Sequence, residues 1–141
     1  MLDPFYSLRS LRSLFIAAVT LSALLLASAS FAAAQQPFTA KAFADAQARG
    51  DTVLVEIHAD WCPTCKAQLP ILNKLSSEPA FSKVVRLRVD FDDQKTVVKQ
   101  FGARMQSTLI VFQGKKEIQR SVGVTDEKAI RALVAAGVHK T

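Results

Sequence analysis

The sequence predicts an α/β fold in which a central mixed sheet of four strands has helices on both faces. Short apolar runs rich in β-branched residues alternate with segments of helical pattern along the chain. Strands separated by a helix are typical of parallel crossovers. The last two runs are separated only by the turn at Gln113–Lys116, which predicts a closing antiparallel hairpin.

The expected elements follow one another closely. Thr39 is the candidate cap of a first helix over 41–49, and Gly50 ends it. A buried strand over 52–57 leads into a turn with two cysteines. The remaining expected elements are a helix to about residue 77, a strand over 84–89, a helix over 94–101 ended by Gly102, strands over 109–112 and 117–122, and a last helix from its candidate cap Thr125 to about residue 136.

The N-terminal segment has the three parts of a secretory signal. Arg9 and Arg12 form a positive region, Leu14–Leu26 an apolar one, and Ala32–Ala34 offers small residues for cleavage. We therefore expect a signal peptide over 1–34 and one domain over 35–141. The alternative is an uncleaved membrane anchor, since about 20 apolar residues cross a bilayer. Both interpretations place the domain outside the cytoplasm, and a bacterial periplasm fits a small redox protein.

Composition excludes one class of partner. The chain has 141 residues and a formal net charge of +6, which could attract acidic partners. Its basic residues are scattered, and no Lys/Arg run is interleaved with aromatic residues, so we expect no nucleic-acid partner. We expect a monomer that contacts a membrane only if its N-terminal segment is retained.

The two cysteines of the chain, Cys62 and Cys65, lie in the segment Trp61–Lys66 between a strand and a helix. This order places the first thiol at a helix N-terminus, where backbone N–H groups favour a thiolate, and the second thiol one turn later. A structural disulfide is the usual use of a cysteine pair in an exported protein. A bridge that closes so short a loop stabilises a fold little, so the pair is better explained as a redox centre.

The spacing also suggests roles for single residues. Cys62, which we expect to be the more exposed thiol, is the candidate nucleophile, and the more buried Cys65 is the candidate resolving thiol. Glu56, an acid in an apolar strand, could be a buried base for Cys65, or it could lie on a solvated face of the strand. Arg86 either pairs with Glu56 or is a surface residue.

A metal site is a weaker interpretation of the same region. His58 gives a His-x3-Cys-x2-Cys spacing, but a zinc site usually has four ligands, and the other histidine, His139, lies near the C-terminus. We expect no metal and no other cofactor, because the Cys62–Cys65 disulfide is itself the redox group.

The segment Ala59–Lys66, set after its strand in this order of elements, resembles the thioredoxin family. The resemblance covers about residues 38–136 and includes a proline inside the following helix, Pro70, and glycines at 102 and 123. It implies a thioredoxin-like fold and a thiol–disulfide oxidoreductase with protein substrates and a separate electron donor or acceptor. It also implies substrate binding by the residues beside the cysteines and in the facing loop: Trp61, Pro63, Ser107 and Thr108.

One position departs from the family pattern. Members of the family have a cis-proline just before the residue that corresponds to Thr108, where this chain has Ser107. A cis bond before serine costs about 2.5–4 kcal/mol, so the loop is either trans and reshaped or holds an expensive cis bond. This departure keeps a second functional class open, a thioredoxin-fold binding module or metal-binding protein with little reductase activity.

Overall fold

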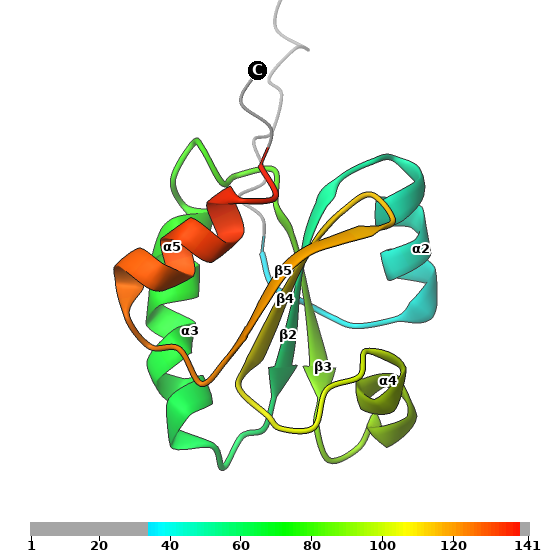
Figure 1. Cartoon of the computed structure of the whole chain (residues 1–141), viewed down its shortest axis with the longest axis vertical. Helices are drawn as coiled ribbons and strands as arrows, with labels where there is room; N and C mark the ends of the chain where they lie inside the picture. Colours follow the sequence, from blue (N-terminus) through cyan, green and yellow to red (C-terminus); the bar gives the residue numbers. More distant parts are fainter. Residues whose placement is uncertain (1–33, 139–141) are drawn as a thin grey trace, which may run out of the picture. The chain divides into compact units, whose positions relative to one another are not determined.

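A five-stranded mixed sheet forms the centre of the domain (Figure 1). The structure, a computed structural model, describes residues 34–138. Its strands have the order β1-β3-β2-β4-β5, in which β1, β3 and β2 are parallel and β4 and β5 are antiparallel to their neighbours. The elements are β1 (Gln36–Pro37), α2 (Ala40–Ala48), β2 (Thr52–His58), α3 (Pro63–Ser76), β3 (Val85–Asp90), α4 (Lys95–Gln100), β4 (Thr108–Gln113), β5 (Lys116–Val122) and α5 (Glu127–Ala135).

The predicted order of helices and strands is confirmed, with one correction. The sequence suggests four strands and a linker over residues 35–37. Two residues of that segment instead form β1, which pairs Gln36 with Leu87 and Pro37 with Arg88. A two-residue strand has no periodic pattern of its own, so only its neighbour β3 identifies it. The predicted signal peptide over 1–34 lies almost wholly outside the described residues.

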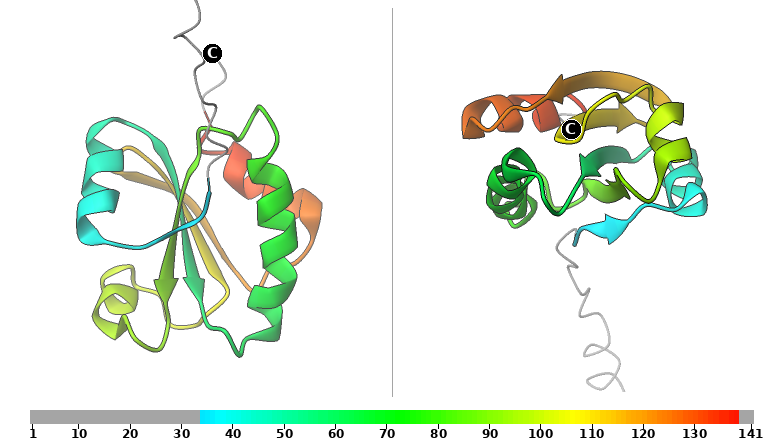
Figure 2. Two further views of the ribbon diagram at one scale, coloured as in Figure 1. Left: turned by 180° about the vertical axis from the view of Figure 1, so that it is seen from behind. Right: turned by 90° about the horizontal axis from the view of Figure 1, so that it is seen from below.

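Helices cover both faces of the sheet, α3 and α5 on one and α2 and α4 on the other (Figures 1 and 2). Successive side chains of a strand point to opposite faces. Val53, Val55 and Ile57 of β2 therefore pack in the cluster that contains Phe38 and Phe112, whereas Leu54 packs with Leu72 and Ile130 of α3 and α5. Both faces of β2 are buried, as its continuous apolar run suggested.

Side-chain caps fix the starts of two helices. Thr39 caps α2 as predicted, because its Oγ1 accepts a hydrogen bond from the backbone N–H of Ala42 at 3.0 Å. The prediction for the last helix is wrong by one residue, since Asp126 and not Thr125 caps α5. Asp126 Oδ1 accepts from the N–H of Ala129 at 2.8 Å, and Glu127 lies in the first turn, where the helix dipole favours an acid.

Four connections meet at one edge of the sheet, at the bottom of Figure 1. The strands β2 and β3 end there, β4 begins there because it is antiparallel to β2, and β5 ends there. The backbone N–H of Gly123 donates to the carbonyl of Ser107 at 3.0 Å and joins the last two connections. This edge therefore brings the cysteine turn beside three other segments.

Within residues 34–138, no helix has both the length and the apolar character needed to cross a membrane.

Candidate active site

Cys62 is the N-cap of α3. Its Sγ accepts a hydrogen bond from the backbone N–H of Cys65 at 3.1 Å, so the first thiol takes the place of a usual capping oxygen. Pro63 at the first helical position has no N–H of its own to satisfy. Both cysteines are free thiols. The predicted position of the pair, at the start of a helix that follows a strand, is confirmed.

The expectation that Cys62 is the more exposed thiol is wrong for this dithiol form. The exposed fraction is 1% for Cys62 and 2% for Cys65. The two cysteines form a buried cluster with Ala59, and Phe91 packs against this cluster. This packing, which the sequence pattern does not show, covers the sulfur of Cys62.

Burial raises the pKa of the Cys65 thiol from 9.0 to about 11. The neighbouring Cys62 contributes to this rise, while backbone hydrogen bonds from Ala59 and Ser107 act in the opposite direction. Cys65 is therefore protonated at neutral pH and has to lose its proton before it can attack a disulfide.

Ser107 lies opposite the cysteines in a trans loop. No peptide bond within residues 34–138 is cis, and Ser107 has φ +57°, a left-handed conformation that few non-glycine residues adopt. Its carbonyl accepts from Gln68 Nε2 at 3.2 Å as well as from Gly123. Ser107 and Thr108 are both buried. Of the two alternatives for this loop, the structure has the reshaped trans form.

Gln68 is a site residue that the sequence did not reveal. It comes from the buried side of α3, and its Nε2 also donates to the carbonyl of Val124 at 2.9 Å. One side chain thus ties the helix with the cysteines to both segments that face them. A glutamine three residues after the second cysteine has no special pattern, so no local signal could have identified it.

The β3–α4 turn holds Trp61 in place. Asp92 Oδ2 accepts from Trp61 Nε1 at 2.7 Å. Asp90 shapes this turn, because its Oδ1 accepts from the backbone N–H groups of Asp92 and Asp93, both at 2.8 Å. The Asp93 N–H contributes most to the lowered pKa of Asp90. An Asp side chain that accepts from the backbone N–H groups two and three residues later is a recognisable turn pattern.

Glu56 is buried and forms an ion pair with Arg86. Arg86 Nε donates to Glu56 Oε1 at 2.6 Å, and Arg86 Nη1 donates to Asn73 Oδ1 and Ser76 Oγ of α3, both at 3.0 Å. The alternative of a solvated Glu56 is excluded. Its described hydrogen bond goes to Arg86 and not to Cys65, so the proposed role as a base for Cys65 stays a prediction.

The site also has an apolar rim. Three large apolar side chains are exposed within residues 34–138, and all three belong to the segments at this edge: Trp61 before Cys62, Met105 before Ser107, and Val122 opposite Thr108. Pro63 is exposed beside Trp61. Exposed apolar groups gathered around a reactive pair suit contact with another protein.

His58 does not join the cysteines in a ligand set. Its Nε2 lies 3.1 Å from Asp60 Oδ1, and residues 34–138 contain no group of three or more His, Cys, Asp or Glu side chains placed to hold a metal ion. The second histidine of the suggested set, His139, lies outside the described residues.

Nearly all of the described residues match one protein family. The family model described as thioredoxin matches residues 34–136. This chain belongs to the thioredoxin family. The predicted fold and the resemblance inferred from the cysteine segment are therefore both confirmed.

Similar proteins include members of the family from distant organisms. The thioredoxin of Chlamydia muridarum is 39% identical over 93 residues, which cover 66% of this chain and 88% of that protein. The crystal structure of Trxlp from Edwardsiella tarda is 40% identical, covers 72% of this chain and 98% of its own, and has a TM-score of 0.70. A thioredoxin structure from Malassezia sympodialis is 28% identical, with coverages of 70% and 88% and a TM-score of 0.63.

Membership of this family, together with the two thiols close to each other at the start of α3, identifies the activity of the chain. The chain is a thioredoxin-family protein-disulfide oxidoreductase, as the sequence predicted. The family acts on protein disulfides together with a redox partner, so the second class of function, a binding module with little reductase activity, is not favoured.

Proposed function

We propose that this chain exchanges disulfides with protein substrates outside the cytoplasm, with Cys62 as nucleophile and Cys65 as resolving thiol. The observation that carries the assignment of roles is the cap of α3, where the Cys65 N–H donates to Cys62 Sγ. This contact places the Cys62 sulfur at the N-terminus of α3, a position typical of reactive cysteines. Cys65, whose pKa is raised to about 11 chiefly by burial, suits the later step, in which it first loses its proton.

The exchange proceeds in two steps, and atoms and electrons balance in each. The Cys62 thiolate attacks one sulfur of a substrate disulfide, forms a mixed disulfide and releases the other sulfur as a thiolate. Cys65 then loses its proton and attacks Cys62 Sγ, which forms the Cys62–Cys65 disulfide and releases the second substrate thiolate. Two electrons pass from the dithiol to the substrate, and the released thiolates take up protons. A separate reductant restores the dithiol.

The same steps run backwards when the partner has the lower reduction potential. The direction of electron flow follows from the potential of the pair relative to its partner. The apolar rim of Trp61, Met105 and Val122, with Pro63 beside it, supports docking of a protein substrate. We propose that Ser107 and Thr108 contribute the facing loop of the docking surface.

A trapping experiment tests the two roles. We use residues 31–141, which contain the compact unit with all described elements. Cys65→Ser should accumulate a mixed disulfide with a protein substrate such as insulin, because nothing resolves it. Cys62→Ser keeps a capping oxygen for α3 and should form no such adduct. The wild-type chain should reduce insulin with dithiothreitol as donor, and failure to do so under these conditions would contradict the proposal.

The location outside the cytoplasm rests on the N-terminal sequence and has its own test. Arg9, Arg12 and the apolar run over Leu14–Leu26 support export. Expression of the full chain in a Gram-negative bacterium, followed by fractionation and intact-mass measurement, should give a periplasmic product that begins at Gln35. A product of full length in the membrane fraction would support the anchor, and a product of full length in the cytoplasm would contradict export.

A further inference from the structure

Gln68 is a buried polar side chain that the two-step exchange described above does not use. It is 3% exposed and lies on the same face of α3 as Cys65, one turn further along the helix. Its amide nitrogen has two N–H groups and donates to two carbonyls, that of Ser107 at 3.2 Å and that of Val124 at 2.9 Å. A buried amide is costly unless it is hydrogen-bonded, so these two contacts fix where the side chain lies.

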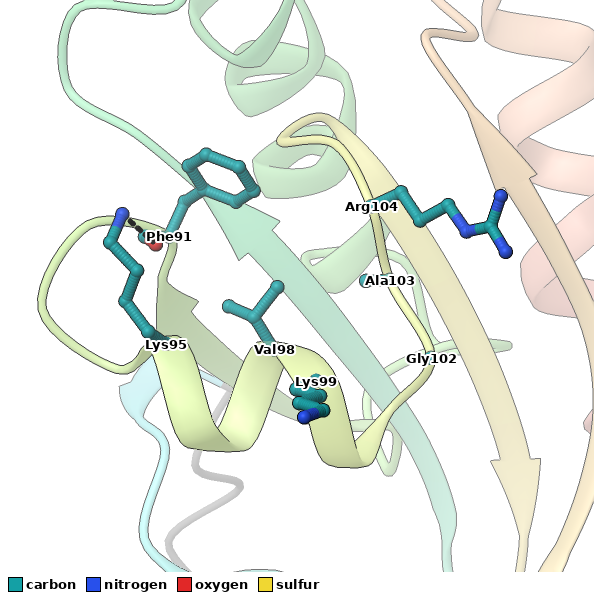
Figure 3. Close-up of a pocket in the computed structure, with 7 residues that line it drawn as sticks. All are labelled: Phe91, Lys95, Val98, Lys99, Gly102, Ala103 and Arg104. Atoms are coloured by element: carbon teal, nitrogen blue, oxygen red, sulfur yellow. Dashed lines mark hydrogen bonds between the residues drawn. The ribbon is translucent and has the colours of Figure 1, made fainter.

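The loop that contains Ser107 is held at both of its ends. It leaves α4 through residues 102–104, which run past this helix (Figure 3). The Ala103 N–H donates to the carbonyl of Val98 in α4 at 3.1 Å and fixes the start of the loop. At the other end, the Ser107 carbonyl accepts from Gln68, which links this end of the loop to the helix with the cysteines.

Ser107 needs such a contact because of its backbone conformation. Its φ of +57° lies in the left-handed region, which costs free energy in a residue other than glycine and persists where neighbouring contacts fix it. The Ser107 Oγ donates to the carbonyl of Gln106 at 2.5 Å, a contact within the loop itself. The Gly123 N–H joins the loop to the turn after β5, and Gln68 joins it to α3.

The place of Ser107 matters for Cys65. Burial raises the pKa of the Cys65 thiol to about 11, and backbone hydrogen bonds from Ala59 and Ser107 act against this rise. Ala59 belongs to the segment that leads into α3, so the dithiol turn positions it. Ser107 comes from the facing loop, whose distance from α3 depends on Gln68.

Ionisable side chains do not give Cys65 the same help. Within residues 34–138, the ionisable side chain that acts on Cys65 is Cys62, and it raises the pKa. Glu56 of β2 and Arg86 of β3, which are buried between the sheet and α3, bond to each other. His58 at the end of β2 pairs with Asp60. The backbone contacts are therefore what favours the thiolate.

We propose that Gln68 is a positioning residue for the resolving step of the exchange. By holding the Ser107 carbonyl, it keeps the backbone of the facing loop against Cys65, so that the proton can leave and the thiolate can attack Cys62 Sγ. The inference rests on the proposed function, because it assigns a residue to one of the two steps proposed there. Loss of the Gln68 amide should slow the second step and leave the first, the attack by Cys62, nearly unchanged.

The acidity of Cys65 tests the inference directly. In residues 31–141 with Cys62→Ser, Cys65 is the sole thiol, and Tyr6, the one tyrosine of the chain, is absent, so absorbance at 240 nm follows the thiolate without a tyrosine signal. Gln68→Met, added to this variant, keeps the length of the side chain and removes both donors. It should raise the pKa of Cys65 and lower the thiolate fraction at a given pH by about three- to tenfold, the effect of one hydrogen bond.

Kinetics with 5,5′-dithiobis(2-nitrobenzoate) test the step itself in the chain with both cysteines. The Cys62 thiolate attacks the reagent, forms a mixed disulfide and releases one nitrothiobenzoate. Cys65 then loses its proton and attacks Cys62 Sγ, which forms the internal disulfide and releases the second nitrothiobenzoate. Two electrons pass from the dithiol to the reagent. The rate of the first phase depends on reagent concentration and that of the second does not, so stopped-flow absorbance separates them.

In Gln68→Met the second phase should slow about two- to fivefold at pH 7, while the first stays nearly unchanged. The change in rate is smaller than the change in thiolate fraction, because a more basic thiolate is also a better nucleophile. Gln68→Ala removes the same donors and should act in the same way, so the result does not depend on how well a methionine packs at this position.

Ile130→Val is the matched control for stability. Ile130 of α5 is fully buried in the cluster that contains Leu72 and Leu75 of α3, and loss of one methylene there weakens the core without removing a hydrogen bond to the loop. This variant should change neither the titration of Cys65 nor the second phase. An effect as large as that of Gln68→Met would show a general loosening of the domain and would overturn the inference.

The remaining outcomes separate this inference from the proposed function. An unchanged pKa of Cys65 in both Gln68 variants, or equal slowing of both phases, overturns the role of Gln68 and leaves the redox function standing. If the wild-type chain shows no second phase that is independent of reagent concentration, the role of Cys65 as resolving thiol fails. The titration then decides by itself whether Gln68 controls the acidity of Cys65.

Discussion

Neighbouring side chains around the two cysteines have different structural and chemical roles. Cys62 caps a helix, Cys65 is buried beside it with a raised pKa, and Gln68 holds the facing loop. Glu56 pairs with Arg86 at 2.6 Å in the layer between the sheet and α3. Because these groups are nearly all buried, a change in any one of them acts on both stability and chemistry, and each test needs a matched control.

The stability of the reduced protein should depend on pH through Cys65. The pKa of this thiol is about 11 in the fold against an ordinary value of 9.0. Between these values the folded protein keeps a proton that the unfolded chain has lost, so its free energy of unfolding should fall as pH rises from about 9 to about 11. Urea unfolding of the reduced wild type and of Cys65→Ser across this range checks it, and equal slopes for both would contradict it.

Removing the charge of Glu56 should be costly. In Glu56→Gln, Arg86 stays buried without an anionic partner, and loss of one member of a buried pair typically costs about 3–5 kcal/mol. Denaturant unfolding measures the loss. Glu117→Gln, which removes an exposed partner of Arg120, should cost no more than about 1 kcal/mol.

The same Glu56→Gln variant tests the role as a base. If Glu56 accepts the Cys65 proton, resolution of a preformed mixed disulfide should slow at neutral pH and recover at high pH, where hydroxide takes the proton. Stopped-flow measurement of the released thiol gives this rate. An unchanged rate would show that Glu56 has only a structural role.

At the scale of elements, the ends of helices position the site. The start of α3 places both thiols, and α4 with its flanking turns forms one wall beside them. Short polar residues at the starts of helices are strong signals, but neighbouring candidates compete. Thr125 and Asp126 are both good caps by type, and the backbone conformation of the turn after β5 decided in favour of Asp126.

The cap of α5 provides a sharp comparison. Asp126→Ala should lower the free energy of unfolding by about 1 kcal/mol, because the Ala129 N–H loses its acceptor. Thr125→Ala should change it by much less. Thermal or urea unfolding of the two variants checks the assignment, and the reverse order of effects would restore Thr125 as the cap.

At the scale of the whole molecule, the end of α5 is packed tightly onto the sheet. Thr52 Oγ1 of β2 donates to the carbonyl of Gly137 at 2.6 Å. A methyl group at Gly137 would overlap Val111 Cγ1 of β4 and lie 3.1 Å from Thr52 Cγ2. The end of the chain after α5 thus lies close against β2 and β4 at a residue without a side chain.

Gly137→Ala should therefore destabilise the domain by about 1–3 kcal/mol through overpacking. Denaturant unfolding checks this. In the double variant Gly137→Ala/Val111→Ala the overlap is relieved, so its cost should be smaller than the sum of the two single costs. Strict additivity would show that the contact with Val111 is not the cause.

The sequence by itself determined the order of elements, the family and the place of both cysteines, because these depend on local hydrophobic pattern, caps and the strand–turn–helix order around Cys62. Only the tertiary structure decided that Cys62 is buried and that Arg86 is the partner of Glu56. It also decided that the loop at Ser107 is trans and that Gln68 holds this loop. Strand pairing sets Arg88, and not Arg86, beside Glu56, yet the ion pair runs diagonally to Arg86. Such contacts join residues about 10 to 60 positions apart, and no local pattern encodes which of several suitable side chains will meet.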